Sequence, residues 1–249
     1  MIKIVLIGSG NVATHLYNAF SGASDVEIIQ VFARTQSSAI PLAVQISNWQ
    51  YLKEADLYII SVSDDAIAEV ASKISFKNKL IVHTSGTTSI DVLPFERKGV
   101  FYPLQTFSKE KQIDFSVVPI CIETNQKEDE NILQKIASLL TPKVYLISSE
   151  QRKALHVAAV FVCNFTNHLY QIGAAICEDN AIPFEIVKPL ITETADKIQN
   201  LAPKDAQTGP AFRGDEKTIQ AHLEFLTNSE YKTLYQFMTQ SIQHHVKKL

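Results

Sequence analysis

The hydrophobic pattern of the chain changes once, near residue 148. Before that point, short apolar runs alternate with amphipathic segments of helical period, which is typical of a mostly parallel sheet with helices on its faces. The expected strands are 2–7, 26–33, 55–62, 79–83, 100–103, 117–123 and 143–147, and the expected helices are 11–20, 65–74 and 128–140. The pattern predicts an α/β domain of the Rossmann type, doubly wound, over residues 1–148.

From residue 149 onward almost nothing has the pattern of a strand. A long helix is expected from about 150 to 180, another begins at Pro183, and two more cover roughly 215–227 and 230–248. We therefore predict an all-helical C-terminal domain over residues 149–249, which would supply substrate contacts and a dimer interface.

The first strand runs directly into a glycine-rich turn, Gly8-x-Gly10-x-x-Ala13, and a helix follows. This is the order of elements in a dinucleotide-binding unit, where the helix N-terminus offers unpaired N–H groups to a pyrophosphate. A three-position match alone is weak, but its place between a strand and a helix favours cofactor binding. The residues expected to bind the cofactor here are Gly8, Ser9, Gly10, Asn11, Val12 and Ala13.

The end of the second strand bears on which dinucleotide is bound. Enzymes that use NAD normally place a carboxylate there for the ribose hydroxyls, but this chain has Arg34 and Thr35. A guanidinium pairs well with a 2′-phosphate, although an exposed Arg in a loop would look the same. We expect NADP as the cofactor, with NAD the less favoured alternative.

Composition and charge limit the partners of the protein. The 249 residues are 46% hydrophobic and carry a formal net charge of −3, so they show no basic footprint for nucleic acid. The three cysteines lack metal-ligand spacing and are expected to be reduced. No apolar run reaches membrane-spanning length, and the first strand leaves no room for a signal peptide. We expect a cytoplasmic protein that acts on a small molecule.

Other strand ends carry polar residues at the edge of the sheet where ligands bind in such folds. Ser61 and Ser63 lie at the carboxyl end of the third predicted strand and are expected to contact the cofactor. Ser85 and Gln105 follow later strands and are candidates for substrate binding. Serine and glutamine are also ordinary loop residues, so both interpretations stay open.

The long predicted helix carries His156 and Asn164 within a segment that is otherwise mostly apolar. With Arg152 and Asn167 they form a polar stripe at helical spacing, which Val160 interrupts. Buried polar groups need partners, so the stripe faces either the protein interior or a ligand. We consider His156 and Asn164 as catalytic candidates, with a purely structural role as the alternative.

A third motif, Thr208-Gly-Pro-Ala-Phe-Arg213-Gly-Asp215, precedes the helix at 215–227. Asp215 is placed to cap that helix, but a cap does not account for Arg213 or for the turn at Thr208. Arg213 could clamp an anionic group of a substrate, with Thr208 beside it.

Together these motifs resemble a bacterial family of Rossmann-like proteins with a helical C-terminal domain of unknown function. The resemblance rests on residues 8–13, Tyr-Pro-Leu-Gln-Thr-Phe at 102–107, His156-x-Ala-Ala with Asn164, and the motif at 208–215. The family is related to pyrroline-5-carboxylate reductase and to the deazaflavin-dependent NADP reductases. The resemblance implies an NADP-binding fold and a homodimer built through the helical domain, but it does not name a substrate.

The more distant hydroxyacid dehydrogenases use a helix Lys four residues before an Asn, where this chain has Val160 before Asn164. Their proton-transfer scheme therefore does not carry over. We predict an NADP-dependent oxidoreductase that transfers a hydride between the nicotinamide and a small carbonyl or imine substrate. His156 would supply the proton or polarise the substrate, and Asn164 would orient it. The alternative is an NADP-binding regulator or redox sensor without turnover.

Overall fold

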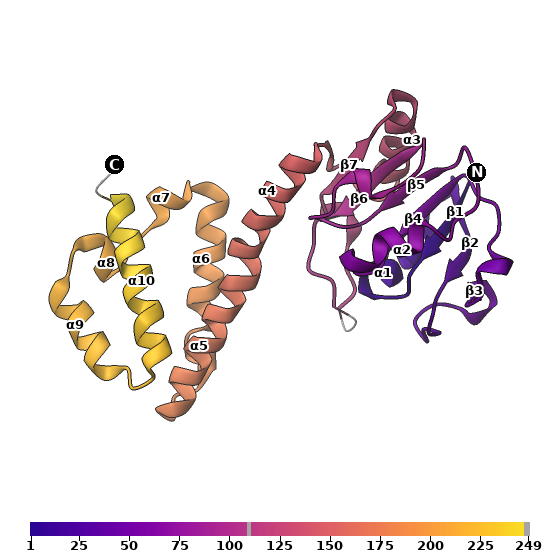
Figure 1. Ribbon diagram of the computed structural model, residues 1–249. Coiled ribbons are helices and arrows are strands. Elements are labelled where there is room, and N and C mark those ends of the chain that lie inside the picture. Colours follow the sequence, from indigo (N-terminus) through magenta and orange to yellow (C-terminus); the bar gives the residue numbers. More distant parts are fainter. Residues whose placement is uncertain (109–110, 247–249) are drawn as a thin grey trace. The chain divides into compact units, whose positions relative to one another are not determined.

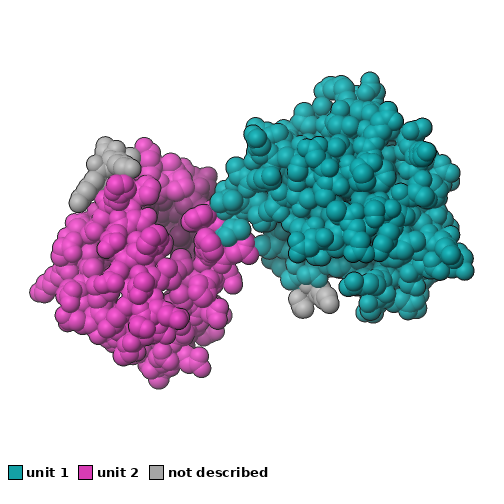
Figure 2. All heavy atoms as spheres, in the orientation of Figure 1, with its two compact units in different colours: residues 1–160 teal, residues 161–249 magenta. Residues whose placement is uncertain are grey.

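The computed structural model describes residues 1–108 and 111–246, and it divides into two compact units. Unit 1 is Met1–Val160 and unit 2 begins at Phe161, as the two colours of Figure 2 show. Each unit is described separately below.

Unit 1 is built on an eight-stranded sheet with the order β3-β2-β1-β4-β5-β6-β7-β8 (Figure 1). All neighbouring strands are parallel except β6 and β7, which are antiparallel. The chain leaves β1 toward β2 and β3 on one side and returns to β4 on the other. The end of β1 is therefore the topological switch point, where ligands bind in open sheets of this kind. The strands are β1 (Ile2–Ile7), β2 (Val26–Phe32), β3 (Gln45–Ile46), β4 (Leu57–Ile60), β5 (Leu80–His83), β6 (Lys98–Pro103), β7 (Ile120–Thr124) and β8 (Val144–Leu146).

Each face of this sheet carries its own hydrophobic core. Helices α1 (Asn11–Ser21) and α3 (Lys127–Ser138) cover one face, where Phe20 and Leu133 pack on alternate strand residues such as Phe101. Helix α2 (Ile67–Ala71) covers the other face. Helix α4 (Ser149–Ala159) begins against that second face through contacts with β7, which are described below. The predicted doubly wound α/β class is confirmed.

Some element bounds differ from those expected, for local reasons. Strand β7 begins at Ile120, because the side chain of Asp114 accepts from the Ser116 amide and a short 3₁₀ turn covers Phe115–Val117. Helix α2 is shorter than expected because Asp64–Ala66 also forms a 3₁₀ turn. The two-residue strand β3 has too few residues to show an alternating pattern.

Unit 2 consists of helices, and the described residues from 149 to 246 contain no strand. A π-helical segment (Val160–Phe165) leads into α5 (Thr166–Asp179), and α6 (Lys188–Asn200), α7 (Pro203–Ala206), α8 (Pro210–Arg213), α9 (Glu216–Phe225) and α10 (Ser229–Val246) follow. The last expected helix extends to residue 248, and its final two residues lie outside the described residues. The all-helical prediction is confirmed.

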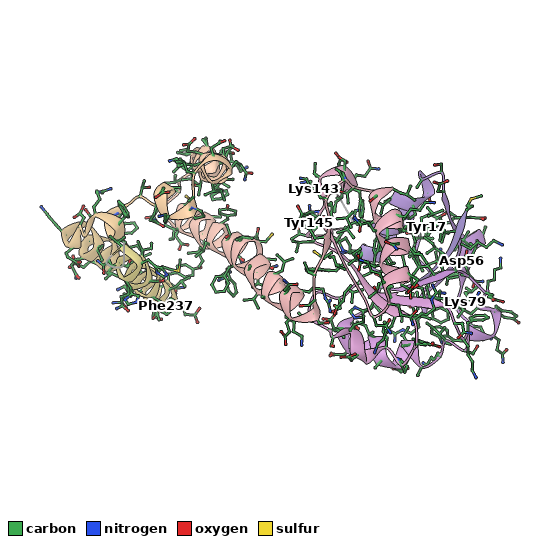
Figure 3. The ribbon with its side chains drawn as sticks, turned by 90° about the horizontal axis from the view of Figure 1, so that it is seen from above. Tyr17, Asp56, Lys79, Lys143, Tyr145 and Phe237 are labelled. Atoms are coloured by element: carbon green, nitrogen blue, oxygen red, sulfur yellow. The ribbon has the colours of Figure 1, made fainter. Side chains whose placement is uncertain are left out.

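Unit 2 buries few of its apolar side chains. Among its described residues, only Ala211, Ile219 and Thr239 are buried, and α5 and α6 bury none. Figure 3 shows Phe237 standing out from α10, and its side chain is 67% exposed. An apolar cavity of about 410 Å³ also opens between α5, α9 and α10. This unit has apolar faces that its own helices do not cover.

The start of the long helix belongs with the sheet, so the units divide after Val160 rather than at residue 148. A capping box fixes this start, since Ser148 and Gln151 each accept a hydrogen bond from the other's backbone amide. The expected helix at 150–180 is also not one regular α-helix, because the π segment at 160–165 interrupts it. The described residues include no helix long and apolar enough to cross a membrane.

Candidate functional site

Position 8 requires a glycine, both for its backbone conformation and for the packing around it. Its φ of +126° lies in the region that favours glycine, and a Cβ there would overlap the carbonyl oxygen of Ser61. This close approach joins the end of β1 to the end of β4. Gly8 therefore shapes the turn that begins the predicted cofactor site.

Gly10 lies in the same turn, but neither its backbone conformation nor its packing requires a glycine. Its φ of −74° suits any residue, and a Cβ there would meet no protein atom within 4 Å. Gly10 caps the N-terminus of α1, and no capping side chain accepts a hydrogen bond from the helix amides there. Unfilled space above uncapped helix amides is what a pyrophosphate needs. The residues present therefore fit a dinucleotide, while Ala13 is small enough to pack fully buried beneath the turn.

The polar side chains of the turn serve to hold it in place. Ser9 Oγ donates to the Thr35 carbonyl oxygen at 3.2 Å, and Asn11 Nδ2 donates to the Phe107 carbonyl oxygen at 2.9 Å. Val12 packs partly buried against the core. Ser9, Asn11 and Val12 can thus offer backbone N–H groups to a phosphate, while two of their side chains brace the turn against neighbouring loops.

Arg34 and Thr35 are exposed directly after β2, at the expected position. The described residues give Arg34 no hydrogen-bonded or ion-paired partner. The Glu69 carboxyl lies within electrostatic reach, since its pKa is lowered mainly by the Lys73 ammonium and to a lesser extent by Arg34. The Arg34 guanidinium is available for a phosphate group.

Ser61 and Ser63 follow β4, and they differ in exposure. Ser61 is buried, and its hydroxyl accepts a hydrogen bond from Thr84 Oγ1 at 3.3 Å. Ser63 is exposed at the start of a 3₁₀ turn, and its side chain makes no capping bond. Of the two, Ser63 has the accessible hydroxyl.

The Ser85 hydroxyl is bonded within its own turn. Its hydroxyl accepts hydrogen bonds from the amides of Thr87 and Thr88, at 3.1 and 3.0 Å, and donates to Thr88 Oγ1 at 3.0 Å. A hydroxyl has one proton and two acceptor positions, so its capacity is used within the turn. Ser85 builds the loop after β5 and does not have a side-chain group left for a substrate.

His156 meets Tyr102 beside the loop that follows β5. The Tyr102 hydroxyl lies 3.2 Å from His156 Nδ1. Gly86 packs against both, because a Cβ there would lie 2.7 Å from His156 Nδ1 and 2.9 Å from Tyr102 Oη. Helix α4, strand β6 and the β5 loop thus converge on one polar pair, and a hydroxyl and an imidazole at such a place can exchange a proton.

The environment of this pair keeps several groups neutral. Burial raises the pKa of Tyr102 to about 12, and burial raises the pKa of the neighbouring Cys121 thiol to about 11. Burial, with the nearby Arg152 charge, lowers the pKa of His83 to about 4. His83 Nδ1 accepts from the Ser85 amide at 3.2 Å, and its buried Nε2 has no partner among the described residues. These side chains carry no charge near neutral pH.

A buried ion pair, which the sequence did not reveal, fixes α4 on the sheet. Arg152 is fully buried and pairs with Glu123 of β7, and it also donates to the Thr88 carbonyl oxygen. Ser149 donates to the same Glu123 carboxylate at 2.9 Å. Arg152 therefore faces the protein interior, which is one of the two alternatives left open for the stripe. Glu123 lies opposite Val100 in the β6–β7 register. The residues around Glu123 in the sequence do not indicate that it pairs with Arg152.

The remaining candidates have exposed side chains. Gln105 follows β6, and its side-chain oxygen accepts from the Thr106 amide at 2.8 Å. Asn164 lies in the π segment of unit 2, where the helical phase differs from the regular spacing used to place it in the stripe.

The motif at 208–215 also belongs to unit 2. Thr208 and Arg213 are exposed, and Arg213 lies 3.9 Å from the Asp215 carboxylate. Asp215 caps α9 as expected, by accepting from the Thr218 amide at 3.1 Å. Gly209 takes a φ of +102°, which the turn at Thr208 requires of a glycine. None of the described residues forms a cluster of His, Cys, Asp and Glu able to hold a metal ion.

Family models match both the sheet-containing part and the helical part of the chain. Residues 118–242 match the family model for the domain of unknown function DUF2520, and residues 3–86 match the coenzyme F420-dependent NADP oxidoreductases. The chain belongs to the DUF2520 family. The match over residues 3–86 shows that the Rossmann domain is of the NADP oxidoreductase type. This confirms the oxidoreductase class and the NADP cofactor that were predicted from the sequence.

Solved structures extend the comparison over the whole chain. A Bacteroides fragilis protein assigned as an NADP oxidoreductase is 42% identical, with a TM-score of 0.88 over 98% of both chains. A Thermotoga maritima protein is 20% identical, with a TM-score of 0.76 over 98% of both chains. Pyrroline carboxylate reductase from Plasmodium falciparum, solved with NADP, is 14% identical, with a TM-score of 0.58 over 99% of this chain and 97% of that one. No curated protein matches.

Proposed function

We propose that this DUF2520 protein reduces a small carbonyl or imine compound with NADPH, and that His156 supplies the proton. The observation that carries the proposal is the polar pair of His156 and Tyr102, packed on Gly86 directly after β5. In open α/β sheets the ligand lies outside the carboxyl ends of the strands. A proton donor on this side of the sheet is what a reductase needs.

NADPH, when bound, supplies the hydride for the substrate carbon. The chain supports it through the Gly10 turn and the N-terminus of α1 at the pyrophosphate, through Arg34 and Thr35 at the 2′-phosphate, and through the Ser63 hydroxyl. Reduction adds one hydride to carbon and one proton to oxygen or nitrogen. His156 gives the proton and regains it from water, so the protein is unchanged after one cycle.

Other exposed polar side chains are the substrate contacts that we propose. Gln105 of unit 1 has an amide that can orient a carbonyl or imine group. In unit 2, Asn164, Thr208 and Arg213 have exposed polar side chains, and the Arg213 guanidinium can bind an anionic group. Ser85 is not included, because its hydroxyl is used within its own loop.

We further propose that the protein is a homodimer joined through unit 2. The support is the set of large apolar side chains that remain exposed on its helices, which include Phe161, Val162, Leu190 and Phe237. Monomers rarely leave so many apolar residues uncovered without an interaction to cover them. A second copy can offer the same apolar helices in return.

The proposed activity is tested with the purified full-length protein, NADPH, and a panel of keto acids, aldehydes and cyclic imines. We expect loss of NADPH absorbance with at least one compound. His156→Ala should lower kcat about 10²- to 10⁴-fold and leave NADPH affinity nearly unchanged, since that range is typical of general acid catalysis.

The matched control is His168→Ala, which removes an exposed histidine of α5 and should keep wild-type rates. Tight NADPH binding with no oxidation across the panel would contradict the proposal and favour an NADP-binding regulator without turnover. Equal rates for wild type and His156→Ala would remove His156 from the reaction.

A further inference from the structure

The contact between Tyr102 and His156 determines more than the place of the histidine ring. A neutral imidazole carries its proton on one nitrogen, and the hydrogen bond made by the other nitrogen decides which. Here Nδ1 faces the Tyr102 hydroxyl at 3.2 Å, while no described residue makes a hydrogen bond to Nε2. The direction of the bond between Tyr102 and His156 therefore fixes which nitrogen of the neutral ring carries the proton and can donate a hydrogen bond to a ligand.

The tyrosine is the donor in this pair. Burial keeps the hydroxyl protonated, because it raises the pKa of Tyr102 to about 12. Among the described residues, the acceptor within reach of the Tyr102 hydroxyl proton is His156 Nδ1. If Nδ1 carried a proton instead, the half-buried hydroxyl would have to leave its own proton without a protein acceptor, which costs free energy.

The surroundings hold the two rings against each other. Gly86 lies so close that a Cβ would contact both Nδ1 and the hydroxyl. Arg152, one helical turn before His156, is tied to Glu123 and to the Thr88 carbonyl oxygen. The helix, the strand and the loop each limit the movement of the pair, so the hydrogen bond is built in before any ligand binds.

We propose that Tyr102 is a positioning residue that donates its hydroxyl proton to His156 Nδ1 and so keeps the ring proton on Nε2. The catalytic consequence rests on the proposed function, in which the Nε2–H group of His156 donates to the reacting group of the substrate. The tautomer itself is a property of this chain alone, and it can be measured without substrate or cofactor.

The test is ¹⁵N NMR of the full-length protein labelled in histidine, at a pH where the ring of His156 is neutral. The His156→Ala variant identifies the signals of this ring. We expect Nε2 to be protonated and Nδ1 to be unprotonated in the wild type. Tyr102→Phe should move both signals toward a mixture of tautomers, because the donor to Nδ1 is gone.

Two controls separate this effect from unfolding. Tyr145→Phe removes the hydroxyl of an exposed tyrosine on β8 in the same unit and should leave His156 as in the wild type. The signals of His83, whose Nδ1 accepts from the Ser85 amide, report whether the sheet edge is intact. A wild-type ring with the proton on Nδ1 would overturn the proposal even if Tyr102→Phe failed to fold. An unchanged tautomer in folded Tyr102→Phe would overturn it as well.

A kinetic measurement distinguishes this inference from the proposed function. With any substrate found in the panel, Tyr102→Phe should lower kcat roughly 2- to 10-fold, the effect of one hydrogen bond, and leave the KM for NADPH unchanged. A panel without turnover counts against the proposed function and leaves the NMR result standing. Wild-type kcat in Tyr102→Phe counts against the role of Tyr102 and leaves the reductase intact.

Discussion

Gly8 and Gly10 stand two residues apart in one turn, and the protein itself requires a glycine at only the first. The backbone at Gly8 has a positive φ and lies against the Ser61 carbonyl oxygen. At Gly10 the φ is ordinary and the space above is open. We therefore propose that a bound ligand is what requires a glycine at position 10.

This difference predicts opposite results for two substitutions. Gly10→Ala should keep the wild-type Tm but weaken NADPH binding roughly 10-fold or more, because the methyl group enters the phosphate space. Gly8→Ala should lower the Tm, because it strains the backbone and overlaps Ser61. Thermal melts and a fluorescence titration of NADPH measure both effects. Unchanged NADPH affinity in Gly10→Ala would contradict this assignment of the turn.

The exposed Arg34 side chain leads us to predict that the protein prefers NADPH over NADH. Arg34→Ala should weaken NADPH binding about 10- to 100-fold and leave NADH binding nearly as it is, since one charge-assisted pair to phosphate is lost. Calorimetric titration with both cofactors measures this. Lys143→Ala, an exposed cation elsewhere in unit 1, serves as the control. Equal weakening of both cofactors would show that Arg34 does not bind the 2′-phosphate.

At the scale of elements, the site depends on how α4 is held to the sheet. The helix begins at a capping box, and its first turn carries Arg152 into a buried pair with Glu123. His156 follows one turn later and reaches Tyr102. The pair of charges thus supports the position of the proposed proton donor.

Breaking this pair should destabilise unit 1 strongly. Glu123→Ala leaves the Arg152 guanidinium buried without its counter-charge, which typically costs about 3–5 kcal/mol. Urea unfolding of the full-length protein, followed by the near-UV signal, measures the change. Glu193→Ala breaks an exposed pair with Lys197 and should cost less than about 1 kcal/mol. Similar costs for both variants would mean that Arg152 finds other partners.

The elements of the site differ in how far the sequence could predict them. The Gly8 turn, the strand ends and the helix with His156 followed from local patterns, because period and turn chemistry are encoded within a few residues. Glu123 and Tyr102 did not follow, because their roles arise only when β6 pairs with β7 and α4 lies on that face. The π segment also escaped prediction, and it changes the phase between His156 and Asn164.

At the scale of the whole molecule, the two units differ in how well they bury apolar surface. Unit 1 has a core on each face of its sheet, whereas three residues of unit 2 are buried among those described. The spacing of apolar residues along the sequence predicted that unit 2 is helical. It could not show that residues 149–160 belong to the same compact unit as the sheet, because that depends on the contacts of Arg152 with the sheet.

The uncovered helices predict a dimer in solution. Light scattering should give twice the 27.8 kDa of one chain. Val162→Glu places a charge on a side chain that is 74% exposed in the single chain, and it should shift the mass toward the monomer. Tyr145→Glu, on the exposed edge strand of unit 1 (Figure 3), should leave the dimer intact. A wild-type monomer would contradict the proposed interface.

The central claim is that this protein passes a hydride from NADPH to a carbonyl or imine carbon. The most direct test uses NADPH with deuterium at C4 of the nicotinamide, prepared in both stereochemical forms, and mass spectrometry of the reduced product. We predict that one form transfers a single deuterium to the product carbon and the other transfers none. Tight cofactor binding without deuterium transfer to any compound of the panel would contradict the claim.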